Sequence, residues 1–243
     1  MKIIAMILTH NNEKIIKNAF AKIPTDLFDA IFISDDSSTD STVKICKEKY
    51  RVFSTDKNLG YGGNAKSGLN AALKNYDFDY IVEIHGDGAQ FDPSTTRKAL
   101  KFINLEYDFI IGSRFINKQK TKQSGISNLR YYSNIILSYI NEKVLRLNIS
   151  EYHTGFRIYS KNFLLTVPWQ KCGNGHIFSF ETLAQVSYYN LKIVEVECEC
   201  DYKSLHTSIS IRNGIIFTFK HFWTMISFLL TKIGIHSKIF PRK

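Results

Sequence analysis

The sequence contains few cysteines and few prolines. Its 243 residues include only four of each, and only Cys198 and Cys200 are close together among the cysteines. There is no CxxC pair and no Cys/His zinc spacing, so we expect reduced, mostly buried thiols rather than a disulfide framework or a structural zinc site. The sequence also lacks internal repeats and any Pro/Ser-rich linker, so it marks no obvious domain boundary.

Long apolar runs are missing as well. The chain opens on a short strand pattern that lacks the longer apolar core and the small-residue cleavage site of a signal peptide. Residues 213–235 are rich in apolar side chains, but Lys220, His221 and Lys232 interrupt them before an uncharged run reaches the roughly 18–20 residues of a spanning helix. We expect a cytoplasmic protein with a C-terminal amphipathic or apolar helix, which lies either in the membrane interface or against the domain.

Acidic residues are absent from 203–243, a segment with seven Lys and Arg. Residues 114–146 carry seven basic residues and one acidic residue, whereas residues 1–113 carry 14 basic and 15 acidic residues. The net charge of +10 is therefore concentrated in two segments. Nucleic acid, a membrane surface and phosphate-bearing substrates all fit this distribution. A composition of 44% hydrophobic and 22% charged residues excludes a disordered chain.

Short apolar runs alternate with helical patterns through the first half of the chain, which predicts a Rossmann-like α/β fold with a mostly parallel central sheet flanked by helices. The expected strands are 3–8, 30–34, 51–54, 79–84, 108–112 and 192–198. The expected helices are 12–21, 40–49, 62–75, 94–105, 129–146 and 179–189, with a polar loop at 115–128 and a glycine-containing turn at 153–157. Ligands of such folds bind at the carboxyl ends of the strands.

Polar residues follow the first two expected strands. Thr9, Asn11 and Glu13 come after the first strand, and Asp35 and Asp36 end the second. Adjacent carboxylates at a strand end are placed to hydrogen-bond a ribose or a base edge. These residues predict a nucleotide site at this edge of the sheet.

Two further strand ends carry residues suited to phosphate chemistry. Gly60 begins a glycine-rich turn before a helix, and Lys66 lies one turn into that helix, although the spacing is not that of a Walker A loop. His85 and Asp87 follow the fourth strand and are placed to hold a divalent cation on a diphosphate. Arg114 follows the fifth strand and adds a permanent cation at the same edge.

Six motifs in this order resemble those of family 2 glycosyltransferases with the GT-A fold, on the branch of the dolichyl-phosphate-mannose synthases. They are Asp35-Asp36-Ser37-Ser38-Thr39-Asp40 (DDGSTD), Asn58-Leu59-Gly60-Tyr61-Gly62-Gly63 (NxGxGG), His85-Gly86-Asp87 (DxD), Gly112-Ser113-Arg114 (GSR), His153-Thr154-Gly155-Phe156-Arg157 (TGFR) and Phe178-Ser179-Phe180-Glu181 (FxxE). The resemblance covers residues 1–210, which we interpret as the GT-A domain, with 211–243 as a C-terminal apolar and basic helical segment that is peripheral to the membrane.

The resemblance implies a role for each motif. The residues expected around the nucleotide-sugar donor are Thr9, Asn11, Glu13, Asp35, Asp36, Gly60 and Lys66. Asp87, with His85, is expected to bind Mg²⁺ or Mn²⁺, and Arg114 and Arg130 to hold the phosphate of a polyprenyl-phosphate acceptor. Such a phosphate is already ionised and needs no general base, and in-line attack inverts the configuration at the anomeric carbon.

The motifs depart from the family pattern at several positions. His85 replaces the first aspartate of DxD, and imidazole favours Mn²⁺ over Mg²⁺ as a softer ligand. Ala89 is a one-residue insertion after that motif, and Glu151 stands where an aspartate usually precedes TGFR. Ser37 replaces the glycine of DDGSTD, and Asn12 replaces an acidic residue.

Other functions remain open at this stage. A glycosyltransferase acting on a sugar hydroxyl of a lipid-linked or surface glycan needs a general base, for which Glu181 or Glu151 is available. A nucleotidyltransferase is disfavoured because no glycine-rich basic loop follows the first strand. A basic nucleic-acid-binding module is disfavoured because apolar runs dominate the basic C-terminal segment. We therefore expect a transferase at the inner face of the cell membrane that binds no nucleic acid.

Overall fold

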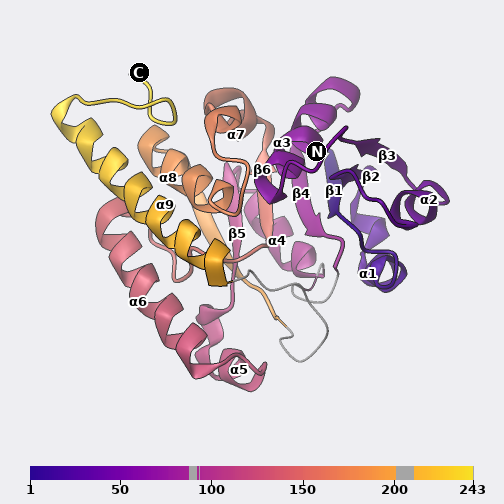
Figure 1. The fold of residues 1–243 in the computed structure, drawn as a ribbon, viewed down its shortest axis with the longest axis horizontal. Coiled ribbons are helices and arrows are strands. Elements are labelled where there is room, and N and C mark those ends of the chain that lie inside the picture. Colours follow the sequence, from indigo (N-terminus) through magenta and orange to yellow (C-terminus); the bar gives the residue numbers. More distant parts are fainter. Residues whose placement is uncertain (88–91, 93, 201–210, 243) are drawn as a thin grey trace.

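The structure is a computed structural model that describes residues 1–87, 92, 94–200 and 211–242. Within these residues, seven strands form one sheet (Figure 1). They are β1 (Ile3–Thr9), β2 (Ala30–Asp35), β3 (Arg51–Ser54), β4 (Tyr80–His85), β5 (Phe109–Ser113), β6 (Arg157–Ser160) and β7 (Ile193–Glu197). Their order is β3-β2-β1-β4-β6-β5-β7, and β6 runs antiparallel to its neighbours β4 and β5. The predicted mostly parallel α/β sheet is confirmed.

Helices cover both faces of the sheet. They are α1 (Ile16–Lys22), α2 (Thr42–Lys47), α3 (Tyr61–Asn75), α4 (Thr95–Ile103), α5 (Lys118–Gln123), α6 (Asn128–Leu145), α7 (Lys161–Thr166), α8 (Phe178–Tyr189) and α9 (Ile211–Leu230), with 3-10 turns at Thr25–Leu27, Phe115–Asn117, Trp169–Lys171 and Thr231–Ile233. Side chains alternate along β1: Ile4 and Met6 pack in the core that α3, α8 and α9 cover, while Ala5 and Ile7 pack in the core under α1, α2 and α4.

The register of the parallel strands aligns their carboxyl ends. Thr9 at the end of β1 lies opposite Asp35 of β2, and Leu8 lies opposite His85 of β4. β6 begins at this same edge because it runs the other way, so the segment before Arg157 also arrives there. The strands β2 and β3 lie on one side of β1, and β4 lies on its other side, so the strand order reverses between β1 and β4. Sheets of this kind bind ligands at such a topological switch point.

Three short elements differ from the sequence-based expectation. The predicted loop at 115–128 is wrong in its middle, where Lys118–Gln123 form α5. The strand β6 and the helix α7 were not predicted from the sequence. The predicted division of the chain at residue 210 falls outside the described residues, as does the insertion at Ala89.

The C-terminal helix α9 packs on the domain along one face. His221, Thr224, Met225 and Phe228 are buried against α8 and α6, whereas Phe219 and Trp223 are exposed. Figure 1 shows α9 and α6 side by side at the edge of the molecule remote from β3. In the described part of the chain, no helix is long and apolar enough to cross a bilayer.

Candidate active site

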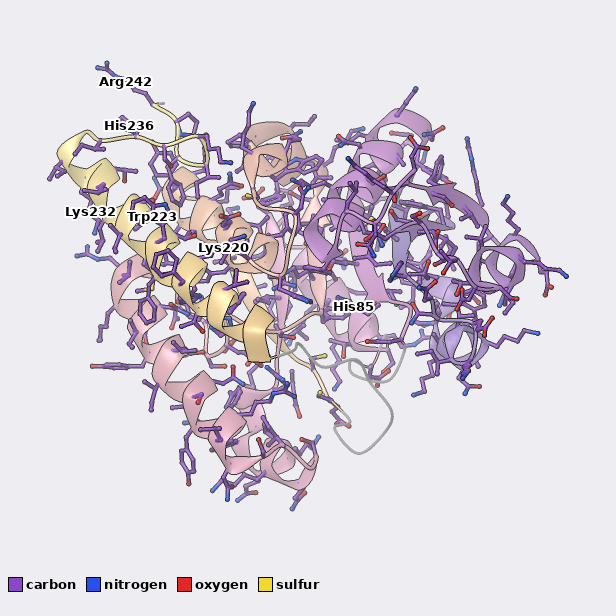
Figure 2. The ribbon with its side chains drawn as sticks, in the orientation of Figure 1. His85, Lys220, Trp223, Lys232, His236 and Arg242 are labelled. Carbon is purple, nitrogen blue, oxygen red and sulfur yellow. The ribbon has the colours of Figure 1, made fainter. Side chains whose placement is uncertain are left out.

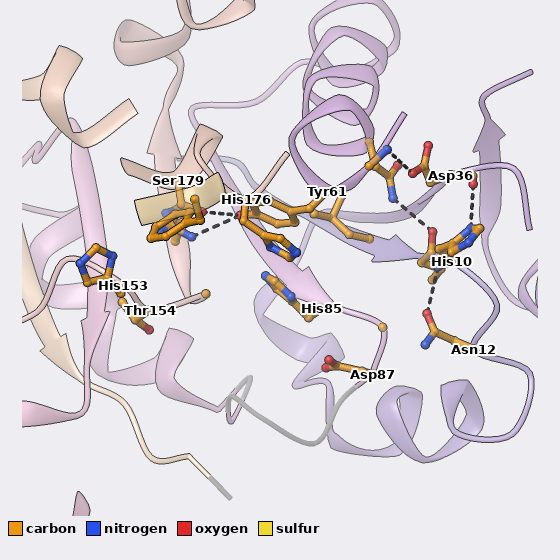
Figure 3. Close-up of a pocket in the computed structure, with 18 of the residues that line it drawn as sticks. His10, Asn12, Asp36, Tyr61, His85, Asp87, His153, Thr154, His176 and Ser179 are labelled. Atoms are coloured by element: carbon orange, nitrogen blue, oxygen red, sulfur yellow. Dashed lines mark hydrogen bonds between the residues drawn. The ribbon is translucent and has the colours of Figure 1, made fainter. Parts of the chain in front are cut away.

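A cavity of about 590 Å³ opens at the carboxyl edge of the sheet (Figure 3). It extends from the ends of β1, β2 and β4 across the start of β6 to α6 and α9. Seven of the predicted site residues line it: Thr9, Asp36, Gly60, His85, Asp87, Arg114 and Arg130. The four others, Asn11, Glu13, Asp35 and Lys66, are not among its lining residues.

The two adjacent carboxylates at the end of β2 hold loops in place. Asp36 accepts hydrogen bonds from the backbone N–H groups of Leu59 and Gly60, both at 2.8 Å. Asp35 accepts from Thr9 Oγ1 at 3.0 Å and from the backbone N–H of Ser38 at 3.0 Å. Both carboxylates are buried, and their oxygens are occupied by these contacts. In this structure they shape the cavity wall by fixing the loops that form it.

Asn11 and Glu13 brace the loop that follows β1. Asn11 Oδ1 accepts from the backbone N–H of Thr39 at 2.8 Å, and Glu13 Oε2 accepts from that of Ser41 at 3.0 Å. These bonds tie residues 9–13 to the turn after β2, behind the surface that lines the cavity. The same loop places His10 in the cavity wall, where Nδ1 donates to the carbonyl of Asp36 at 2.8 Å and Nε2 accepts from Asn58 Nδ2 at 2.9 Å.

Lys66 points away from the cavity. Its Nζ donates to the carbonyl of Cys172 at 2.7 Å and lies 3.4 Å from that of Gln170. Burial lowers the pKa of this ammonium group. The contacts fasten α3 to the segment before α8, and Lys66 is not among the residues that line the cavity.

Three aromatic rings form a stack in the centre of the cavity. Tyr61 lies between His85 and His176, with ring centroids 5.5 Å and 5.6 Å away (Figure 3). The hydroxyl of Tyr61 donates to Glu83 Oε1 at 2.5 Å and lies 3.2 Å from Arg157 Nη1. The stack is therefore hydrogen-bonded, through the Tyr61 hydroxyl, to a group of buried polar side chains.

That polar group is built around a buried carboxylate, Glu83. Tyr159 Oη donates to its Oε2 at 2.8 Å, and His85 Nε2 lies 3.3 Å from its Oε1. Burial would raise the pKa of Glu83, but His85 and Arg157 outweigh it and hold that pKa below its ordinary value. Burial would lower the pKa of His85, but Glu83 outweighs it and raises the pKa. The Glu83 carboxylate thus pairs with the His85 ring and fixes it in the stack.

Asp87 has the chemistry expected of a cation ligand. Its Oδ1 is buried and has no hydrogen-bond partner among the described residues. Within the same residues, no cluster of three or more His, Cys, Asp or Glu side chains is placed to hold a metal ion by itself. Oxygen atoms of a bound diphosphate would complete the coordination of a cation at Asp87, which is the usual way Mg²⁺ is held beside a nucleotide. His85, which faces Glu83, fits this role less well.

Arg114 and Arg130 lie at the other end of the cavity. Arg114 is buried, and Glu151 accepts hydrogen bonds from its backbone N–H and from its Nε, both at 2.7 Å, and from its Nη2. Burial lowers the pKa of Arg114 to about 10, so it stays cationic at neutral pH. Arg130, on the first turn of α6, is half-buried. Arg130 brings a positive charge to this end of the cavity, and Arg114 adds a guanidinium group whose charge is paired with Glu151.

Several cavity residues were not predicted from the sequence. His10, Tyr61, His153 and His176 line it, and so do Ser133, Asn134 and Leu137 of α6 and Phe217 of α9. Tyr61 and His153 belong to recognised motifs, which is the signal that could have found them. The α6 residues carry no local signal, because their contribution depends on how that helix docks against the sheet.

Comparisons with known proteins give a consistent result. Residues 5–167 match the model of glycosyl transferase family 2. The chain is 26% identical over 254 residues to UDP-N-acetylglucosamine–dolichyl-phosphate N-acetylglucosaminyltransferase from Methanococcus voltae, covering 96% of this chain and 98% of that protein.

The fold is similar to that of glucosyl-3-phosphoglycerate synthase from Mycobacterium tuberculosis. In complex with UDP, that enzyme has a TM-score of 0.69 at 15% identity, over 98% of this chain and 82% of the other. In complex with Mn²⁺, UDP and glucosyl-3-phosphoglycerate, the TM-score is 0.67 at 15% identity, over 98% and 81%. At this identity the likeness shows the fold alone.

Proposed function

The chain belongs to glycosyl transferase family 2, and we propose that it transfers a sugar from a nucleotide-sugar donor to a polyprenyl phosphate. The predicted enzyme class, a glycosyltransferase with the GT-A fold, is confirmed by the family and the fold. The observation that carries the proposal is a single cavity with two different ends. One end holds the buried carboxylate of Asp87, and the other holds Arg114 and Arg130 next to apolar side chains of α6 and α9.

The donor end is formed by the loops after β1 and β2. Asp36 and Gly60 form its wall, and His10 and Asn58 present side-chain nitrogens there. The Methanococcus voltae relative uses UDP-N-acetylglucosamine by its name, and the Mycobacterium tuberculosis synthase binds UDP. UDP-sugars are therefore the first donors to test.

Asp87 would hold a divalent cation, Mg²⁺ or Mn²⁺, with the diphosphate of the donor. Such an ion neutralises the charge that develops on the departing nucleoside diphosphate. The buried Oδ1 of Asp87, which lacks a partner among the described residues, supports this assignment. Glu83 and Tyr61 keep His85 in place beside it.

The acceptor phosphate binds at Arg114 and Arg130. Two cations at one end of the cavity favour a dianionic group and hold it for attack on the sugar. A phosphate oxygen attacks the anomeric carbon, the bond from that carbon to the diphosphate breaks, and the nucleoside diphosphate leaves with the electron pair. The attack from the opposite side inverts the anomeric configuration, and no proton has to be removed.

A hydroxyl acceptor would require a general base, and the available glutamates are occupied. Glu151 accepts hydrogen bonds from Arg114, and Glu181 Oε2 accepts from the backbone N–H of Gly173 at 2.5 Å. Neither is among the described residues that line the cavity. These contacts favour the phosphate acceptor over the hydroxyl alternative.

We propose that the protein works at the cytoplasmic face of the cell membrane, with peripheral attachment. A polyprenyl phosphate is held in a bilayer by its hydrocarbon chain, so the enzyme must work at its surface. The basic segments at 114–146 and 203–243 suit the anionic head groups of that surface.

The experiment that tests the function is a thermal-shift panel followed by a transfer assay. UDP-, GDP- and dTDP-sugars are each added with and without Mn²⁺ or Mg²⁺, since a ligand that binds the native state raises its melting temperature. We expect one donor class to stabilise the protein in the presence of the metal, and Asp87→Asn to abolish that effect. Sugar from that donor should then appear on a polyprenyl phosphate. Transfer to saccharide hydroxyls alone would overturn the proposal.

A further inference from the structure

The helix α6 exposes a row of large apolar side chains. Leu129, Tyr132, Ile136 and Tyr139 have between 53% and 80% of their surface accessible. Their spacing of three and four residues places them on one face of the helix. The opposite side of α6 is packed in the protein, where Tyr131, Ser138 and Leu145 are buried. The exposed row is therefore additional to the packing of the domain.

The neighbouring helix α9 exposes a second such row. Phe219 and Trp223 have 73% and 60% of their surface accessible, and the exposed Ile226 of α9 and Ile233 of the following 3-10 turn continue the row. Figure 2 shows Lys220 and Trp223 along this helix, at the edge of the molecule, and Lys232 in the turn that follows it. Soluble domains seldom expose several large apolar side chains side by side without a binding partner. The helices α6 and α9 pack against each other, so one pair of neighbouring helices carries both rows.

The charges around these rows point to an anionic partner. Lys143 continues the spacing of the α6 row, and its Nζ lies 5.1 Å from the ring of Tyr139. Lys220 and Lys232 flank the α9 row, and residues 203–243 contain no acidic residue. A second copy of the chain would bring the same positive charges to the contact. An anionic lipid bilayer instead matches both the apolar side chains and the basic ones.

The same two helices also line the catalytic cavity. Arg130, Ser133 and Leu137 on the adjacent face of α6 reach it, and so does Phe217 of α9. A lipid with its phosphate at Arg130 would therefore find apolar side chains on the same helices for its hydrocarbon chain. This step rests on the polyprenyl-phosphate acceptor proposed above.

We propose that the exposed faces of α6 and α9 form a docking surface for anionic lipid bilayers, which brings the cavity to the membrane in which the acceptor is held. The surface consists of Leu129, Tyr132, Ile136, Tyr139, Phe219, Trp223, Ile226 and Ile233, with Lys143, Lys220 and Lys232 around it. Both α6 and the C-terminal segment thus contact the membrane through this surface.

The direct test is co-flotation with phosphatidylcholine vesicles that contain or lack phosphatidylglycerol. The full chain should float with the anionic vesicles, and added salt should weaken the binding. The double variants Leu129→Ser/Ile136→Ser and Phe219→Ser/Trp223→Ser should each lower vesicle affinity about tenfold or more, because each removes two inserting side chains. The matched control is Leu105→Ser/Leu165→Ser, which removes equally exposed leucines on other parts of the surface and should bind like the wild type.

Tryptophan fluorescence gives a second readout that does not depend on stability. Trp169 is fully buried and Trp223 is exposed, so brominated lipids should quench Trp223 alone. Quenching that remains in a Trp223→Phe variant, equal loss in the control variant, or a dimer that the same substitutions dissociate would overturn the docking surface.

The assay also separates this inference from the proposed reaction. A water-soluble, short-chain polyprenyl phosphate should be glycosylated equally well by the wild type and by the docking variants. Only transfer to the long-chain acceptor in vesicles should fall in those variants. Vesicle binding without any transfer would overturn the proposed function and leave the docking surface in place. Transfer to the acceptor in vesicles without binding through α6 and α9 would overturn the docking surface and leave the proposed function in place.

Discussion

Asn141 on α6 and His221 on α9 form a hydrogen bond in the interior of the protein, with Oδ1 and Nε2 2.8 Å apart. Both side chains are almost completely buried. The other end of the same amide, Nδ2, lies 3.4 Å from Nε2 of His153, which lines the cavity. Phe180 stacks on the His221 ring with centroids 3.7 Å apart. The C-terminal helix is therefore connected to the cavity wall by a polar link through α6.

This link predicts that the two imidazoles are held in opposite tautomers. An amide presents a donor at one end and an acceptor at the other, so the two rings cannot both present Nε2–H to it, whichever way the amide is turned. Nitrogen-15 NMR of histidine-labelled protein should show one ring protonated at Nε2 and the other at Nδ1. His221→Gln and His153→Gln assign the signals. Two rings in the same tautomer, or two charged rings, would contradict the link.

The same histidines predict a loss of stability in acid. Burial lowers the pKa of His221 to about 4, and burial together with His221 lowers that of His153 to about 3. In the unfolded chain both protonate near pH 6.5, so below that pH the unfolded state binds more protons and the free energy of unfolding falls. Each histidine contributes up to about 1.4 kcal/mol per pH unit between pH 6.5 and its folded pKa.

Urea unfolding between pH 7.5 and 5 measures this slope. His221→Gln removes one titrating group, so the stability of this variant should fall less steeply with pH than that of the wild type, by about one proton. An identical slope in His221→Gln and the wild type would rule out this origin of acid sensitivity.

The sequence was sufficient to predict which edge of the sheet carries the site. Strands such as β1 are unbroken apolar runs with polar residues directly after them, and parallel strands bring these ends together. The position of Lys66 could not be predicted in this way. It lies four residues after Gly62, on the face of α3 that packs against residues 170–178, so its ammonium group is directed there.

The way in which β6, α6 and α9 contribute to the cavity could not be predicted from local sequence patterns, for a related reason. The four residues of β6 pair between β4 and β5, and this long-range pairing is what brings His153 and Thr154 to the cavity. Likewise, Asp36 belongs to a recognised motif, but its hydrogen bonds to the N–H groups of Leu59 and Gly60 depend on how two loops meet. Such contacts follow from the tertiary arrangement, which single-residue patterns do not encode.

Arg130 provides the sharper test of the acceptor-binding arginines. Arg114→Ala leaves Glu151 buried without its cation, which should cost about 3–5 kcal/mol of stability and obscure any effect on transfer. Arg130→Gln removes a half-buried cation from the cavity, and we expect it to raise the KM for the polyprenyl phosphate about tenfold or more. The donor-induced thermal shift should not change.

The control for Arg130 lies on the same helix. Arg146→Gln removes an exposed arginine just after the C-terminus of α6, away from the cavity, and should leave both KM and stability near the wild-type values. Steady-state kinetics with varied acceptor concentration makes the comparison. An unchanged acceptor KM in Arg130→Gln would show that this cation does not hold the phosphate.

Gly62 at the start of α3 predicts a coupling between packing and donor binding. A Cβ atom there would lie 2.6 Å and 2.8 Å from the carbonyl oxygens of Gly173 and Gly175 and 2.5 Å from Cβ of Phe178. Backbone atoms cannot turn aside, so Gly62→Ala must push α3 away from this segment, at a cost of about 1–3 kcal/mol. The shift would also disturb Gly60, which lines the donor end of the cavity and whose carbonyl accepts a hydrogen bond from the backbone N–H of Asn64 on α3.

We therefore expect Gly62→Ala to lower the free energy of unfolding and to weaken donor binding together. Gly175→Ala is the matched control, because a Cβ atom at that position meets no other atom within 4 Å and should change neither quantity. Urea unfolding and titration with the donor measure the two effects. A Gly62→Ala protein that is destabilised but binds the donor like the wild type would show that the turn at Gly60 keeps its shape independently of α3, and would remove this loop from the determinants of donor affinity.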